Sequence, residues 1–186
     1  MRKLIALFLL CLSTHAFSLE LEGVRLDDKV HVGNATLQLN GAGVRTKLFF
    51  KVYICTLYLG EKKRTASAVL ADVGAKRMTM HMLRELSGDK LMEAFDKGLA
   101  ANNTPAELAA IDVRIKEFSA IFRTANEVAK GDVITLDYFP GEGTRISING
   151  AEKGRLSGAE FNRALLKIWL GDEPVDADLK KGLLGG

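Results

Sequence analysis

The sequence predicts an α+β fold in which an antiparallel, open-faced β-sheet is covered on one face by helices. Segments with strand-like alternation group at 19–59, 77–83 and 132–156, and the longer segments with helical spacing group at 87–123 and 157–184. Such grouping differs from the regular strand–helix alternation of a doubly wound parallel sheet. Grouped strands with segregated helices are typical of the α+β class.

The first 18 residues have the composition of a secretory signal peptide. Two basic residues precede the uncharged run LIALFLLCL, and small or polar residues follow it. The run is much shorter than the roughly 20 residues of a membrane-spanning helix. We therefore expect cleavage after Ala16 or Ser18, a periplasmic or secreted protein without a stable membrane anchor, and one domain at 19–186.

Charge and cysteine content exclude several functions. The first 18 residues hold two of the 26 basic residues and none of the 23 acidic ones, which leaves 24 basic against 23 acidic residues. This balance, without clustered Lys and Arg, argues against nucleic-acid binding. Cys55 is the only cysteine beyond the signal peptide, and its apolar neighbours predict a buried, unreactive thiol.

No motif indicates a metal or another cofactor, so we expect none. The chain has no HExxH, no pair of CxxC and no EF-hand loop. His31 and His81 are far apart in sequence, and structural roles are expected for both. The glycines at 41–43 lead into a strand, whereas a phosphate-binding glycine loop leads into a helix.

Residues 48–59 (LFFKVYICTLYL) form the most strand-prone segment of the chain. Only Lys51 is charged, and the segment is rich in aromatic and β-branched residues. A strand that is apolar on both faces is usually central and covered on both sides. Residues 40–43 before it are expected to form a flexible turn.

The strand expected at 77–83 places three methionines on one face: Met78, Met80 and Met82. Methionines spaced by two residues make a deformable apolar surface. A core face and the lining of a lipophilic pocket both fit this pattern.

Helices are expected at 65–73, 87–101 and 105–123, and two more near the C-terminus. Thr104 and Pro105 form a start signal for the third helix. Ser157 is expected to cap a helix that carries Phe161, Leu165, Ile168 and Trp169, and a short helix is expected at 177–184. Asn149–Gly150 is a strong hairpin signal between two strands.

The segment GAGVRTKLFFKVY at 41–53, followed by LYL at 57–59, joins several residue types at fixed spacing. It resembles the segment by which chalcone isomerase-like domains are identified. More loosely, residues 19–184 follow the order of elements in that family, and its exported bacterial branch is the most similar. The resemblance implies a cleft between the open-faced sheet and its helices.

The resemblance implies a role for Arg45 in that cleft. In the plant enzymes the matching arginine favours the attacking phenolate, and a water held by a threonine and a tyrosine stabilises the enolate. In fatty-acid-binding relatives the arginine holds the carboxylate of the ligand, which suits its planar fork of donors. Tyr53 falls at or near the threonine position, and residues 88–98 contain neither the tyrosine nor the asparagine of the enzymes' helix.

Three functions follow from this sequence. The leading hypothesis is non-catalytic binding of a fatty acid or similar lipophilic carboxylate by Arg45, Tyr53 and the three methionines. The second is an intramolecular lyase of the chalcone isomerase type, with Arg45 and Tyr53 as catalytic residues. The third is a structural protein with a vestigial cleft, whose sheet or C-terminal helices bind another exported protein that the sequence does not identify.

Overall fold

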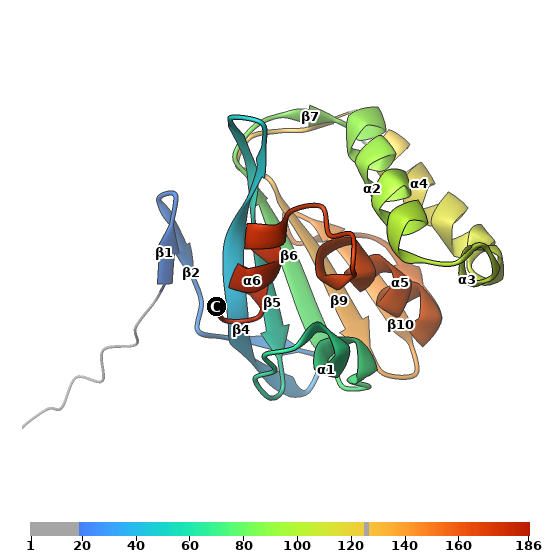
Figure 1. Ribbon diagram of the computed structural model, residues 1–186, viewed down its shortest axis with the longest axis horizontal. Helices are drawn as coiled ribbons and strands as arrows, with labels where there is room; N and C mark the ends of the chain where they lie inside the picture. Colours follow the sequence, from blue (N-terminus) through green and yellow to red (C-terminus); the bar gives the residue numbers. More distant parts are fainter. Residues whose placement is uncertain (1–18, 125–126) are drawn as a thin grey trace, which may run out of the picture.

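A curled antiparallel sheet with the strand order β11-β10-β9-β6-β5-β4-β3 organises the chain (Figure 1). The computed structural model describes residues 19–124 and 127–186, so the predicted signal peptide lies outside the described residues. The strands of the sheet are β3 (Lys29–Val32), β4 (Ala35–Lys47), β5 (Phe50–Leu59), β6 (Lys76–Met82), β9 (Val133–Phe139), β10 (Gly143–Ile148) and β11 (Ala151–Leu156). Two small pairs lie outside it: β1 (Leu19–Leu21) with β2 (Val24–Leu26), and β7 (Leu86–Ser87) with β8 (Glu127–Val128).

Helices cover one face of this sheet, which confirms the predicted fold class (Figure 1). In the described part of the chain they are α1 (Ala66–Ala71), α2 (Gly88–Asn102), α3 (Pro105–Ala110), α4 (Asp112–Thr124), α5 (Ala159–Leu170) and α6 (Ala177–Leu183). No helix within 19–124 or 127–186 is both long and apolar enough to span a bilayer.

β5 is the central strand that its composition predicts, because it lies between β4 and β6 and is buried from Val52 to Leu59. Its helix-facing residues join the main core, where they lie opposite the methionines of β6: the pairs are Tyr53 and Met82, Cys55 and Met80, and Leu57 and Met78. On the other face, Tyr58 packs with Val32 and Leu37 in a second, smaller cluster. The curled end of the sheet thus covers the face that lacks helices.

A buried carboxylate organises the polar part of that second face. Asp137 is 1% exposed and accepts two hydrogen bonds from Arg77, at 2.5 and 2.8 Å, and one from Arg145, at 2.7 Å. The hydrogen bonds with Asp137 raise the pKa of Arg77. The two guanidinium groups therefore compensate the buried anion.

Two helix boundaries differ from the prediction. The helix expected at 105–123 is two helices, because Ile111 leaves the helical conformation at φ −118° and buries its side chain in the core. The capping box of Thr104 and Glu107 at the start of α3 agrees with the predicted start signal. Ser157 is not the cap of α5; Gly158 occupies that position with φ 98°, a conformation that favours glycine.

The flexible turn predicted at 40–43 is wrong, since these residues lie inside β4, where 41–43 pair with β5 and Asn40 lies at a register shift. Their small size serves a close contact with α6. A Cβ atom on Gly41 would lie 2.1 Å from the carbonyl oxygen of Gly182, and one on Gly182 would lie 2.5 Å from that of Ala42. Asn40 secures the contact by donating to the carbonyl of Leu183 at 2.7 Å.

Replacing Gly41 with alanine should therefore destabilise the fold by about 1–3 kcal/mol, because a methyl group there overlaps the backbone of α6. Urea unfolding measures the change. Gly60→Ala is the matched control, because its Cβ would meet no atom within 4 Å. Equal midpoints for the two variants would contradict the close contact.

Candidate functional site

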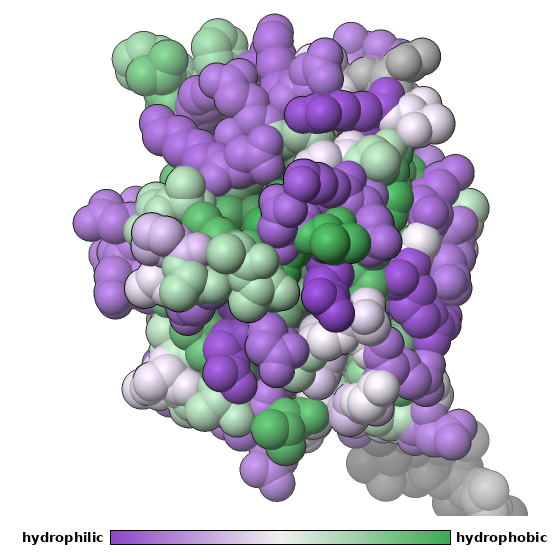
Figure 2. All heavy atoms as spheres, turned by 90° about the vertical axis from the view of Figure 1, so that its right-hand side faces the viewer, coloured by the Kyte–Doolittle hydropathy of each residue, from purple (hydrophilic) through white to green (hydrophobic). Residues whose placement is uncertain are grey.

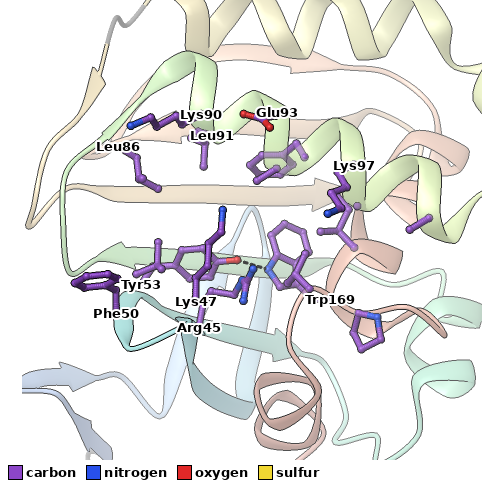
Figure 3. A pocket seen from close by; sticks show the side chains of 18 of the residues that line it. Arg45, Lys47, Phe50, Tyr53, Leu86, Lys90, Leu91, Glu93, Lys97 and Trp169 are labelled. Atoms are coloured by element: carbon purple, nitrogen blue, oxygen red, sulfur yellow. Dashed lines mark hydrogen bonds between the residues drawn. The ribbon is translucent and has the colours of Figure 1, made fainter.

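A cavity of about 680 Å³ opens between the β4–β5 hairpin, α2 and the segment after α5. This volume lies within the roughly 300–1,000 Å³ typical of small-molecule sites. Figure 3 shows the cavity with α2 on one side and the strands on the other. Most of its wall is apolar, through Val52, Leu86, Leu91, Ala94, Phe95, Ile168 and Val175.

The charged residues around the cavity are mostly basic. Five basic and two acidic residues line it: Arg45, Lys47, Arg84, Lys90, Lys97, Glu93 and Glu173. Among the residues that the structure describes, the four basic residues other than Arg45 form no ion pair. An apolar cavity with an excess of positive charge is complementary to an amphipathic anion.

Arg45 lies near the end of β4, with its side chain 18% exposed. Its Nη1 atom donates to the carbonyl of Thr46 at 2.7 Å and lies 3.7 Å from a carboxylate oxygen of Asp176. Asp176 also accepts from the Thr46 N–H at 3.0 Å and from the first N–H groups of α6. The aspartate thus fixes one edge of the guanidinium, and Nε and Nη2 have no hydrogen-bond partner among the described residues.

Tyr53 lies next to Arg45, because the two residues are register partners on β5 and β4. Its side chain is buried, and its hydroxyl oxygen accepts a hydrogen bond of 3.0 Å from Nε1 of Trp169 (Figure 3). Burial raises the pKa of Tyr53, and the neighbouring Cys55 adds to this rise. The phenol therefore stays neutral and retains a proton that it can donate to an anion in the cavity.

Contacts between aromatic rings hold the helix side of the cavity wall in place. The ring of Phe95 on α2 lies 5.7 Å from that of Trp169 on α5, in a T-shaped arrangement, and 5.1 Å from that of Phe118 on α4. These contacts join three helices and fix the orientation of Trp169. The Tyr53 hydroxyl is consequently held in place before any ligand arrives.

The structure brings two of the predicted site residues, Arg45 and Tyr53, together at the cavity, whereas the three methionines do not reach it. Met78, Met80 and Met82 are at most 2% exposed, belong to the main core and do not line the cavity. They therefore form the core face that was the other interpretation of their spacing. Burial also raises the pKa of Cys55, which lies fully buried beside them.

Several residues of the site were not predicted as such. Trp169 was assigned only to an apolar helix face, although the indole N–H of a buried tryptophan usually has a partner. Leu91 and Phe95 lie on the helix expected at 87–101, which the sequence did not connect with a cavity lining. Asp176 and Lys97 carry no pattern that distinguishes them from surface charges. Only the packing of α6 brings Asp176 to Arg45, and only the packing of α2 brings Lys97 to the cavity.

The chain belongs to the chalcone isomerase-like family, whose model matches residues 18–185. Among solved structures, a fatty-acid binding protein of Arabidopsis thaliana is similar, with a TM-score of 0.64 and 17% sequence identity over 87% of this chain and 92% of that chain. At this identity the likeness shows the fold alone. A comparison with curated proteins finds no match.

The buried phenol of Tyr53 predicts a specific loss of stability in alkali. Its folded pKa lies above the ordinary value near 10, so above about pH 10 the unfolded chain releases a proton that the folded chain keeps. The contribution of Tyr53 to stability should be fully present below that pH and fall above it. For each pH unit above about pH 10, the free energy of unfolding of the Tyr53→Phe variant should fall by up to about 1.4 kcal/mol less than that of wild type. Urea unfolding between about pH 9 and pH 11 measures the difference.

Cys55 and Tyr58 also have raised pKa values, and their contribution remains in both proteins. The difference in slope between wild type and variant therefore isolates Tyr53. Parallel slopes would show that the phenol ionises as readily in the folded protein as in the unfolded chain, and would contradict its burial.

Proposed function

We propose that the protein binds a fatty acid or a similar lipophilic carboxylate in this cavity, without catalysing a reaction. The observation that carries the proposal is the pairing of Arg45 and Tyr53 at the wall of a mostly apolar cavity. The carboxylate would accept hydrogen bonds from the uncommitted edge of the guanidinium and from the phenol. The tail would lie along the apolar residues of α2 and α5.

Pre-organisation supports this assignment. Asp176 and Trp169 hold the two head-group donors, so little side-chain freedom is lost when a ligand binds. Hydrogen bonds to charged groups contribute about 1.5–3 kcal/mol, more than those between neutral groups. Both donors would bond a charged carboxylate, but only the guanidinium is itself charged and can offer two parallel N–H donors, so it should contribute more to affinity than the phenol.

The polar groups of α2 favour binding over catalysis. This helix contributes Lys90, Glu93 and Lys97 to the cavity and no tyrosine or asparagine, the two donors of the plant enzymes' helix. The similar protein from Arabidopsis is named a fatty-acid binding protein, which is consistent with a carboxylate ligand.

We further propose that the protein acts in the periplasm or after secretion. The support is the basic start, short apolar run and small residues of the first 18 residues. The mass of protein isolated from the exported fraction tests this proposal, because it should correspond to cleavage after Ala16 or Ser18. Recovery of the uncleaved chain from the cytoplasm would contradict it.

Fatty-acid binding can be measured through Trp169, which is the only tryptophan of the chain and lines the cavity. Titration with oleic acid should change its fluorescence. Arg45→Ala should weaken binding by about tenfold to a hundredfold, because the variant loses the charge-assisted bonds. Tyr53→Phe should weaken it by about threefold to tenfold.

Lys153→Ala is the matched control for loss of one positive charge, because Lys153 lies exposed on β11 and does not line the cavity. Methyl oleate, which lacks the carboxylate, should bind wild type and Arg45→Ala with similar, weak affinity. Equal affinity of the wild type for the acid and its ester would refute recognition of the head group.

A further inference from the structure

The end of the β4–β5 hairpin exposes three consecutive apolar side chains, Leu48 and Phe49 in the turn and Phe50 at the start of β5, which we call the hairpin tip. Their exposed fractions are 81%, 95% and 56%. The other large apolar residues that are exposed in the described chain lie apart from one another: Leu19, Val73 and Val113. Figure 1 shows this hairpin projecting at the upper end of the molecule, and Figure 2 shows apolar residues projecting at the same end.

Neither solubility nor the turn itself explains the residues of the hairpin tip. Leu48 has a φ of 58°, a left-handed conformation that suits glycine or asparagine and is unfavourable for leucine. The β10–β11 turn uses Asn149 and Gly150 in that conformation. An exposed leucine in an unfavourable conformation, followed by two exposed phenylalanines, indicates a role outside the fold.

Cations surround the hairpin tip. Lys47 precedes it, Lys51 follows it, and the guanidinium of Arg84 lies 4.6 Å from the ring centre of Phe50. Lys51 pairs with Glu22 at 2.7 Å, and Glu85 follows Arg84 in sequence. Lys47 and Arg84 belong to none of the ion pairs that the structure records for the described residues, so both can bind an external anion.

This combination matches the surface of an anionic bilayer. Aromatic and aliphatic side chains insert at the boundary between head groups and acyl chains, and neighbouring Lys and Arg bind the lipid phosphates. A protein partner would need an apolar recess lined with acidic groups. An anionic bilayer offers apolar acyl chains and negative charge over its whole surface. A narrow protruding hairpin can enter it without deforming the sheet.

We propose that the hairpin tip docks reversibly on an anionic phospholipid bilayer. Leu48, Phe50 and Arg84 also line the cavity, so docking brings the cavity entrance to the lipid surface. A fatty acid could then pass between bilayer and cavity without crossing water. That consequence depends on the proposed function, whereas docking itself does not.

Flotation with lipid vesicles tests the docking. The chain from residue 19 onward contains every element of the structure and lacks the apolar run of the first 18 residues, which would itself bind lipid. Without added fatty acid, it should float with vesicles of phosphatidylcholine and phosphatidylglycerol. It should float less with vesicles of phosphatidylcholine alone, or at high salt.

The double variant Leu48→Asn, Phe49→Ser should reduce partitioning to anionic vesicles by at least about tenfold, because it removes the inserted apolar groups. It should fold normally, since asparagine suits the φ of Leu48. Val73→Ser, Val113→Ser is the matched control, because it removes two exposed apolar side chains elsewhere and should leave partitioning unchanged.

Lys47→Gln, Arg84→Gln should reduce the preference for anionic vesicles by roughly fivefold for each charge removed. Wild-type protein that stays with the unbound fraction would overturn the proposal and leave a protein partner for the hairpin tip. Equal flotation of the hairpin-tip variant and wild type would overturn it too. Fatty-acid binding measured in vesicle-free buffer is a separate result, so failure of one proposal does not imply failure of the other.

Discussion

The close approach of α6 to β4 is the constraint on which the candidate site depends. Glycines at 41 and 182 let the two backbones meet, and any side chain at either position would overlap a carbonyl group of the other element. This contact places Asp176, the N-cap of α6, beside Arg45, which lies on the same strand as Gly41. A feature that resembles a flexible loop in the sequence is thus a packing surface that positions the guanidinium.

The two sides of the cavity are held by different means. Charge and backbone packing fix Arg45, whereas buried aromatic rings fix Trp169 and, through its indole N–H, the hydroxyl of Tyr53. The core beneath β5 is filled by methionine and aliphatic side chains, so the cavity does not leave the sheet poorly packed. A well-packed core beneath a pre-formed cavity suits a binding protein, since little reorganisation opposes the ligand.

The sequence was sufficient to predict the order of strands and helices and to single out Arg45 and Tyr53 as candidate site residues, because period, capping residues and the motif are local signals. It did not show that the two residues are cross-strand partners. It failed where a distant contact decides the conformation. Residues 40–43 remain in a strand because α6 packs on them, and Ile111 ends a helix because its side chain enters the core. Leu48 was assigned to a strand because its apolar character gives no sign of an exposed turn.

The state of the bound carboxyl group tests the central claim most directly. A long-chain fatty acid labelled at its carboxyl carbon can be titrated by NMR while it is bound to the protein. Pairing with the fixed guanidinium of Arg45 should hold the carboxyl pKa below the value of a free fatty acid, and Arg45→Ala should remove that depression. A bound carboxyl that titrates identically in both proteins would contradict the account.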